Sequence, residues 1–216
     1  MTHDYILYAD ARVVACNKPA GMPIAPDQTG DLSLMTYLEH ALGILYPAHR
    51  IDRPASGLVL FARDREAAAL LSAQFSQRLA RKVYWAITRN APEAEQGELR
   101  HHIVEGRANR SVARPHPAPQ SREALLDYRI VGRSERYAKW EIVLHTGRKH
   151  QIRAQLAAIG YPVKGDVKYG DRRSNPDRSI ALHARILEFQ HPDSGLSMRI
   201  EAPPPDSEPL WSIFGV

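Results

Sequence analysis

Residues 49–62 read HRIDRPASGLVLFA, a charged segment that runs directly into an uninterrupted apolar one. The apolar half has the pattern of a short strand that is buried on both faces. The charged half places Asp52 between Arg50 and Arg53, beside a proline and a glycine that are typical of turns. A charged loop that leads into a buried strand holds polar side chains on a rigid support, as many functional sites require.

Asp52 can be interpreted in two ways. Nearby positive charge favours the ionised form of a carboxylate, and an ionised, positioned carboxylate can be a nucleophile, a general base or a metal ligand. The alternative is a structural aspartate that caps a turn and pairs with a neighbouring arginine, because structural ion pairs produce similar charge patterns. The spacing of the residues alone leaves both interpretations open.

The composition indicates a globular protein. The chain has 216 residues, of which 44% are hydrophobic and 25% are charged, so we expect a single domain over residues 1–216. Cys16 is the only cysteine, which excludes an internal disulfide and favours a reducing compartment. The N-terminus lacks the pattern of a signal peptide, and no apolar run has the length of a membrane span. We therefore expect a cytoplasmic protein without a membrane partner.

The positive charge is concentrated in one stretch. The net charge is +5, but residues 100–153 alone contain 12 Lys and Arg against 5 Asp and Glu. The rest of the chain is therefore slightly acidic. A basic stretch of this kind is expected for a protein that binds a polyanion such as nucleic acid. The alternative is a solvated basic surface without a partner.

Strands dominate the expected secondary structure. Hydrophobic patterns predict strands at 6–8, 13–16, 81–87, 125–131 and 139–144, and a hairpin made of 186–190 and 196–202. Three helices are expected: one near 32–43 with Asp31 as N-cap, one from Asp64 to about Ala80, and one from 145 to Gly160. In the second helix a stripe from Ala68 to Leu79 is expected to face the core.

Residues 89–123 are the least regular part of the sequence. They contain four prolines and several arginines, and a loop of this length is usually functional or disordered. We expect a mobile basic arm that binds RNA through Arg107, Arg110 and Arg114. His101, His102 and His116 have no carboxylate or cysteine at a ligand-like interval, so no metal site is expected.

Several motifs resemble those of one enzyme family. The segment HRIDRPASG resembles the H-R-L-D-x-x-T-S-G signature of the RluA-type pseudouridine synthases, with Ile51 for Leu and Ala55 for Thr. Further segments resemble other motifs of that family: NKPAG at 17–21, KVYWA at 82–86, TGRKHQIR at 146–153, PVKGD at 162–166 and LHA at 182–184. Their order along most of the chain argues against coincidence.

The resemblance implies an α+β fold with a mixed, mainly antiparallel sheet, flanking helices and a central cleft. It implies isomerisation of uridine to pseudouridine in structured RNA without a cofactor: uracil leaves C1′ of its ribose, rotates and rejoins through C5. Asp52 would be the catalytic carboxylate, Arg153 its ion-pair partner, and Tyr84 the ring that lies against the base. Whether Asp52 attacks C1′ or removes the proton from C2′ stays open.

Arg50 and Arg53 are expected to contact RNA beside Asp52. In the resembling family the arginine that corresponds to Arg50 is placed at the displaced base, where a planar guanidinium can stack and pair with phosphate. The alternative is an Arg50 that pairs with a nearby acid and braces the loop. Arg148, Lys149 and His150 are expected in the first turns of the third helix, where the helix dipole also favours phosphate.

Other possibilities remain at this stage. The target RNA can be tRNA or rRNA, although the short architecture without an S4 domain resembles the tRNA-modifying branch that includes TruC somewhat more closely. No protein partner is evident, so we expect a monomer. A non-catalytic RNA-binding module and a hydrolase that uses Asp52 with His49 or His150 are the two alternatives from other functional classes.

Overall fold

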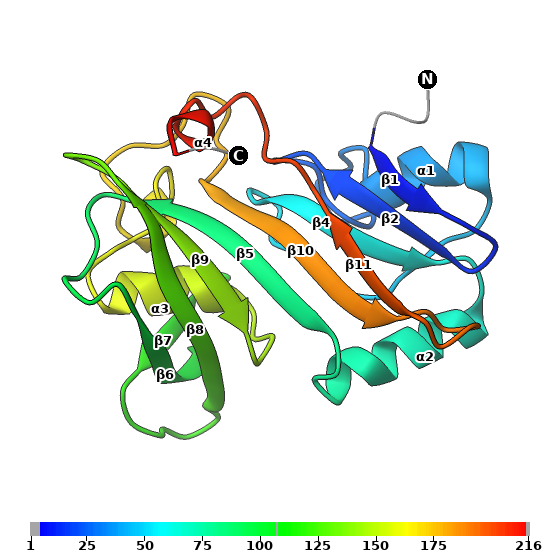
Figure 1. The fold of residues 1–216 in the computed structure, drawn as a ribbon, viewed down its shortest axis with the longest axis horizontal. Helices are drawn as coiled ribbons and strands as arrows, with labels where there is room; N and C mark the ends of the chain where they lie inside the picture. The colour runs from blue at the N-terminus through cyan, green and yellow to red at the C-terminus, as the bar shows by residue number, and fades with distance from the viewer. Residues whose placement is uncertain (1–4, 107, 215–216) are drawn as a thin grey trace. The chain divides into compact units, whose positions relative to one another are not determined.

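The computed structural model describes residues 5–106 and 108–214, which form two compact units (Figure 1). The first unit contains the chain up to Lys82 and again His183–Pro205, and the second contains Val83–Leu182 and the chain from Asp206 onward. The divisions fall inside strands β5 (Arg81–Thr88) and β10 (Leu182–Gln190). A division inside a strand has no linker composition, which is why the sequence predicts only one domain.

The sheet of the first unit is mixed. Its order is β1-β2-β4-β10, with β3 paired to β4 and β11 paired to β10. The strands are β1 (Ile6–Ala9), β2 (Val13–Lys18), β3 (Tyr46–Pro47), β4 (Ser56–Ala62) and β11 (Ser197–Glu201). β4 runs parallel to β10, and the other pairs in this unit are antiparallel. All seven residues of β4 are buried, as the apolar run predicts.

Helix α2 (Arg65–Ser76) packs against β3 and β4. Asp64 is its N-cap, as predicted, because its carboxylate accepts a hydrogen bond from the backbone N–H of Ala67 at 2.8 Å. The helix ends at Ser76, before the end of the predicted hydrophobic stripe. Leu79 therefore lies outside the helix and is 62% exposed, so the prediction that it faces the core is wrong.

Helix α1 (Leu34–Leu42) begins two residues later than expected. Its N-cap is Ser33, whose hydroxyl accepts from the backbone N–H of Thr36 at 3.1 Å. The prediction of Asp31 as N-cap is wrong, because the carboxylate of Asp31 pairs with Arg53 instead. Gly43 ends the helix with a φ of 76°, a conformation that glycine adopts without a steric penalty.

The second unit contains a sheet in the order β5-β9-β8-β6-β7. Besides β5, its strands are β6 (Gln96–Glu105), β7 (Ser111–Arg114), β8 (Arg122–Arg133) and β9 (Ala138–Leu144). The pairs β6–β7, β6–β8 and β8–β9 are antiparallel. The unit also contains α3 (Gln151–Ala158), the short 3-10 helix η1 (Val167–Tyr169) and α4 (Leu210–Ile213).

Residues 89–123 are not an irregular loop. β6 and β7 form a hairpin there, with Ile103 opposite Ala113 and Val104 opposite Val112. Most of the hairpin is exposed or half-buried, and only Ile103 of β6 and the first residue of β7 are buried. A strand that buries so little needs few apolar residues, so the alternation that marks a strand in the sequence is weak here.

The structure confirms the expected fold class, α+β with mixed, mainly antiparallel strand pairing and few helices. The central cleft that the resemblance implies stays a prediction. None of the helices in the described part of the chain has the length or the apolar content that a bilayer span requires.

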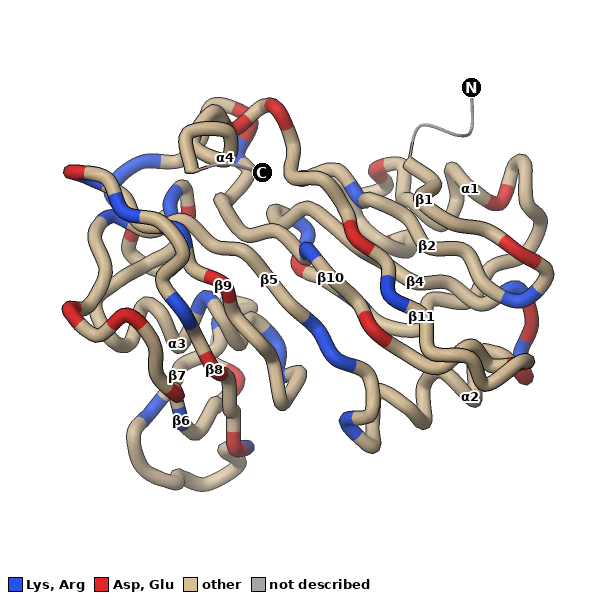
Figure 2. The backbone as a smooth tube through the Cα atoms, viewed as in Figure 1, with Lys and Arg blue, Asp and Glu red and all other residues tan. Residues whose placement is uncertain are grey.

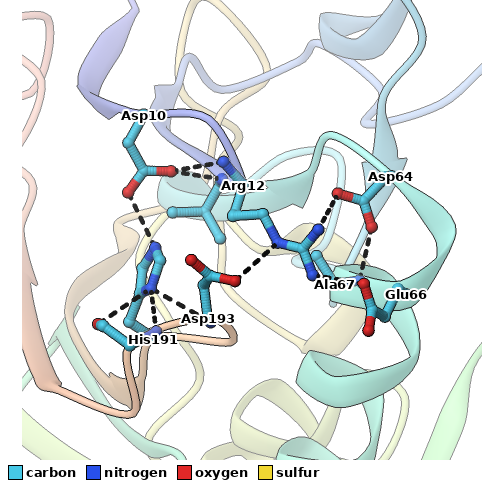
Figure 3. A network of polar contacts seen from close by, with 9 residues as sticks. Asp10, Arg12, Asp64, Glu66, Ala67, His191 and Asp193 are labelled. Atoms are coloured by element: carbon cyan, nitrogen blue, oxygen red, sulfur yellow. Dashed lines mark hydrogen bonds and ion pairs between the residues drawn. The ribbon is translucent and has the colours of Figure 1, made fainter.

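A polar network joins the two hairpin turns of the first unit (Figure 3). Asp10 accepts hydrogen bonds from the backbone N–H groups of Arg12 and Val13, at 2.7 and 2.8 Å, and from Nε2 of His191 at 2.9 Å. The Nδ1 atom of His191 accepts from backbone N–H groups in the β10–β11 turn. The imidazole thus connects that turn to the turn between β1 and β2.

Arg12 extends this network to the start of α2. Its guanidinium lies 3.0 Å from Asp64, the N-cap residue, and 2.8 Å from Glu66 in the first turn. Acidic side chains are favourable at a helix N-terminus, and here they also bind a half-buried arginine. The network therefore holds together three segments that are far apart in the sequence.

We predict that Asp10→Asn lowers the free energy of unfolding by about 2 kcal/mol near neutral pH. Partial burial raises the pKa of Asp10, but hydrogen bonds from the Tyr8 hydroxyl, the turn amides and His191 outweigh it and lower the pKa to about 2. A carboxylate with a lowered pKa stabilises the fold above its unfolded pKa of 3.8 and loses this contribution as the pH falls through about 2.

Urea unfolding of wild type and Asp10→Asn between pH 2 and pH 7 measures this effect. The difference between the two proteins should be full above about pH 4 and shrink at lower pH. Asp193→Asn is the matched control, because the Asp193 side chain is 70% exposed and lies 3.9 Å from Arg12. A difference that is equally large at pH 2 and pH 7 would contradict the prediction.

Candidate active site

The loop that carries Asp52 leads into the parallel pair of β4 and β10. Ser56 and Gly57 lie opposite His183 and Ala184 in this pair. Nε2 of His183 lies 3.0 Å from the carbonyl oxygen of Ala202, which can only accept, so Nε2 carries the proton and Nδ1 accepts from the Ser56 hydroxyl at 2.9 Å. Burial lowers the pKa of His183 to about 4, so the ring is neutral. The HRIDRPASG and LHA segments therefore meet through a buried structural contact.

Gly57 is required by the close approach of β10. Its φ is +111°, and a Cβ atom at this position would lie 2.3 Å from the carbonyl oxygen of Ala184. Any other residue would both strain the backbone and overlap with the neighbouring strand. The glycine of the signature therefore sets how closely the Asp52 loop approaches β10.

Lys18 binds the same loop through its buried ammonium group. Its side chain is fully buried, and Nζ donates to the carbonyl oxygens of Pro19, Met22 and Arg53 at 2.8, 2.9 and 3.1 Å. Burial lowers the pKa of Lys18 to about 7, and the negative charge of Asp52 opposes this shift. Three carbonyl acceptors match the three N–H donors of the ammonium form. The NKPAG segment thus supplies a buried cation close to Asp52.

Arg53 has a structural role that its sequence position does not indicate. Its guanidinium donates to the Gly21 carbonyl and the Thr29 hydroxyl, at 2.8 and 3.0 Å, and pairs with Asp27 and Asp31. These contacts brace the extended segment before α1. The predicted contact of Arg53 with RNA therefore gains no support. Lys18 is a cation near Asp52 that the sequence did not single out.

Arg50 is different, because its side chain is exposed. Within residues 5–106 and 108–214 its guanidinium makes no hydrogen bond or ion pair. The brace interpretation requires an acidic partner for this side chain, so the structure disfavours it.

His49 lies beside the loop and is half-buried. Its ring packs 4.8 Å from the Phe75 ring, and Nε2 accepts from the backbone N–H of Leu60 at 3.1 Å. Burial lowers the pKa of His49 to about 3, so the imidazole is neutral at physiological pH. A nitrogen that already accepts a backbone hydrogen bond is a poor general base, which argues against a hydrolase that pairs His49 with Asp52.

The second unit holds the other two predicted catalytic residues. Tyr84 lies in β5 and is 8% exposed, and its neighbours Val83 and Ala86 are buried as well. The next side chain, Trp85, packs against the ammonium of Lys139, which lies 3.5 Å from the ring centroid. Tyr84 is therefore a largely buried side chain in a strand whose residues are mostly buried.

Arg153 is buried in α3 and forms a bidentate ion pair with Asp166. Its Nε and Nη2 atoms lie 2.6 and 2.9 Å from the two carboxylate oxygens of Asp166. Its Cζ atom lies 4.7 Å from the centroid of the Tyr169 ring. Sequence reasoning missed Asp166 and Tyr169 as partners of Arg153. The PVKGD segment contains Asp166 and resembles a family motif, but the sequence does not indicate that Asp166 pairs with Arg153.

The turn before α3 corrects another expectation. α3 begins at Gln151, after His150 with a left-handed φ of 52°, so Arg148, Lys149 and His150 are not in the first turns of the helix. The Gln151 side chain accepts from the backbone N–H of Arg148 at 2.9 Å and from the Thr146 hydroxyl at 2.8 Å. These bonds shape a turn that presents basic side chains ahead of the helix.

A basic pocket of about 280 Å³ lies beside this turn. Its charged lining residues are Arg122, Arg148, Lys149 and Glu105, and Lys149 lies 3.7 Å from the Glu105 carboxylate. Elsewhere in the second unit, basic and acidic residues are interspersed along the strands (Figure 2). The pocket is therefore a local excess of positive charge.

Two of the remaining predicted residues lie on the β6–β7 hairpin. Arg110 and Arg114 are exposed there, and Arg107 lies outside the described residues. His101 contacts Gln155 at 3.2 Å. In the described part of the chain, no group of three or more His, Cys, Asp and Glu residues is arranged to hold a metal ion.

Comparison with known proteins places these features in a family. Residues 12–158 match the family model described as RNA pseudouridylate synthase. A tRNA pseudouridine synthase C of Haemophilus ducreyi is 34% identical over 221 residues, which cover 91% of this chain and 89% of the relative. The structure of human RNA pseudouridylate synthase domain containing 1 gives a TM-score of 0.80 at 25% identity, covering 98% of this chain and 89% of that one.

The chain therefore belongs to the RNA pseudouridylate synthase family and is an enzyme that isomerises uridines in RNA. Within this family it is of the RluA type, as its motifs indicate. A further relative, described as the uncharacterized RNA pseudouridine synthase YlyB of Bacillus subtilis, is 32% identical and covers 93% of this chain and 69% of its own length.

We predict that Gly57→Ala destabilises the protein by about 3 kcal/mol or more, because backbone strain and overlap with β10 add up. Turnover should fall as well, since the overlap displaces the loop that carries Asp52. Gly195→Ala is the matched control: its φ is also positive, at 67°, but a Cβ there meets no atom within 4 Å among the described residues. Thermal unfolding and a turnover assay test both variants. Equal effects of the two substitutions would contradict the prediction.

Proposed function

We propose that this enzyme is a tRNA pseudouridine synthase in which Asp52 is the catalytic carboxylate. The observation that carries the choice of tRNA is the similarity to relatives named tRNA pseudouridine synthase C. Those of Pasteurella multocida and Salmonella typhi are 35% and 36% identical and cover 87% and 91% of this chain. Because the similarity covers nearly the whole chain, it includes the segments that are proposed to contact RNA as well as the proposed catalytic motifs.

Asp52 suits the catalytic role because its loop is fixed from several sides. Lys18 binds the Arg53 carbonyl, the backbone N–H of Ala55 donates to the Asp52 carbonyl at 3.1 Å, and Gly57 docks on β10. The reaction requires either attack on C1′ or removal of the C2′ proton, and both need a carboxylate held in one place. Rigid support of this kind reduces the reorganisation that the reaction requires.

Arg153 and Tyr84 complete the proposed catalytic set. A guanidinium has five N–H donors, and Asp166 takes two of those of Arg153. Arg153 is proposed to orient the carboxylate of Asp52, as the motif resemblance implies. Tyr84 supplies an aromatic ring from β5, which we propose to lie against the uracil.

The RNA backbone is proposed to follow the basic side chains of the second unit. Arg148 and Lys149 line the pocket beside the turn before α3, and Arg110 and Arg114 extend from the β6–β7 hairpin. Arginine and lysine bind phosphate through charge-assisted hydrogen bonds. Binding should accordingly weaken as salt is added, because each neutralised phosphate releases counterions.

We predict that Asp52→Asn lowers turnover by at least about a hundredfold, because the amide can neither attack C1′ nor accept the C2′ proton. RNA affinity should be retained, since the substitution keeps the shape of the side chain. Tritium release from RNA labelled at C5 of uridine measures the reaction, because C5 loses its hydrogen when it joins C1′. Asp206→Asn, at an exposed position, is the control.

Wild-type turnover in Asp52→Asn would refute the catalytic assignment. The target requires a separate measurement, in which pseudouridines are mapped in all RNA from cells with and without this gene. A site lost only in tRNA supports the proposal, and a site lost only in rRNA contradicts the tRNA assignment while leaving the catalytic assignment intact.

We predict that Arg50→Ala slows the reaction by about tenfold on a base-paired or stacked uridine. Flipping the nucleotide costs stacking energy, and the guanidinium of Arg50 can offset this cost by stacking in place of the flipped base. An unstructured oligonucleotide has little stacking to replace, so turnover on it should change little. Arg65→Ala, which removes an exposed arginine from α2, controls for the loss of charge. Equal slowing of Arg50→Ala on both substrates would indicate a structural role.

A further inference from the structure

Tyr169 lies at a junction of three segments of the second unit. It ends η1 and is 4% exposed, in a small core cluster with Ile103 of β6, Ala124 of β8 and Ala154 of α3. The residues around it are mostly alanines, so Tyr169 is the largest side chain of the cluster. The packing of the β6–β7 hairpin on α3 therefore depends strongly on this one ring.

The ring of Tyr169 contacts two arginines. The Cζ atom of buried Arg153 lies 4.7 Å from its centroid, and that of exposed Arg110 lies 5.1 Å from it. Cation–π contacts are strongest where the cation is desolvated, so the contact with Arg153 is the stronger one. One aromatic ring thus connects a proposed catalytic guanidinium to an exposed cation of the hairpin.

The hydroxyl of Tyr169 makes a second set of contacts. It accepts from the backbone N–H of Ser111 at 2.8 Å and is hydrogen-bonded to Nδ1 of His150 at 3.0 Å. Ser111 begins β7 and His150 ends the turn before α3, in a left-handed conformation that is uncommon outside glycine. The hydroxyl therefore joins the hairpin to that turn.

Asp166 and Tyr169, which both contact Arg153, belong to the same 3-10 turn. Asp166 precedes η1, and its carbonyl accepts from the backbone N–H of Tyr169 at 3.0 Å. Side chains three residues apart lie on the same face of a 3-10 turn. The carboxylate and the ring can therefore reach the same guanidinium, the carboxylate at its N–H edge and the ring at its face.

We propose that Tyr169 is a positioning residue for the reaction. Its ring fixes the plane of the Arg153 guanidinium. Its hydroxyl fixes the position of the β6–β7 hairpin relative to the turn at His150. One side chain therefore sets both the reaction geometry and the placement of the hairpin that is proposed to bind RNA. The inference rests on the catalytic role of Arg153 proposed above. It predicts that the two parts of the side chain affect different kinetic constants.

Tyr169→Phe and Tyr169→Leu separate these two parts. The Phe variant keeps the ring and loses the hydroxyl, so the KM for RNA should rise about fivefold, the factor of one neutral hydrogen bond, while kcat stays near the wild-type value. The Leu variant also loses the ring, so kcat should fall by about tenfold or more. Tyr128→Phe is the control, because Tyr128 is a buried tyrosine of the same unit outside this cluster.

Tritium release at varied RNA concentration gives both constants, and thermal unfolding verifies that each variant is folded. Wild-type KM in the Phe variant, or wild-type kcat in a folded Leu variant, would overturn the inference. If the Leu variant does not fold, the KM of the Phe variant decides. Arg153→Ala tests the catalytic role of Arg153 separately from the positioning role of Tyr169. Full activity of Arg153→Ala would refute the catalytic role of Arg153. An inactive Arg153→Ala together with a fully active Tyr169→Leu would refute only the role of Tyr169.

Discussion

The close approach of β4 and β10 at Gly57 is the constraint on which the Asp52 loop depends. The two strands run parallel there, and a Cβ atom on Gly57 would lie 2.3 Å from the Ala184 carbonyl oxygen. The neighbouring contact between Ser56 and neutral His183 fixes the register of the same pair. Since Asp52 stands only a few residues before β4, its position follows from how these backbones meet.

Buried charge has a role in both units. Burying an ionised group is unfavourable unless its hydrogen-bonding capacity is satisfied. In the first unit, Lys18 donates to three backbone carbonyls, and in the second Arg153 donates to both oxygens of Asp166. A buried ion pair is weak evidence for stability, but these hydrogen bonds orient both side chains. Orientation is what a catalytic carboxylate and its partner require.

The sequence predicted regular elements well where local chemistry decides them. The apolar run of β4, the cap at Asp64 and the strands β8 and β9 are confirmed, since each depends on residues adjacent in the chain. The β6–β7 hairpin was missed because it buries too little surface to need an apolar pattern. The helix start at Gln151 was missed because it depends on the conformation of the preceding residue and on hydrogen bonds to the Gln151 side chain.

By itself, the sequence determined the family, the reaction and the candidate residues Asp52, Tyr84 and Arg153, because motif residues can be read in order along the chain. Only the tertiary structure decided the partners of the charged side chains. Arg53 pairs with Asp27 and Asp31 in the segment before α1, and Lys18 supplies a buried cation near Asp52. Such pairings join residues whose separation in sequence carries no signal. They follow instead from which buried groups must find a partner when the strands pack.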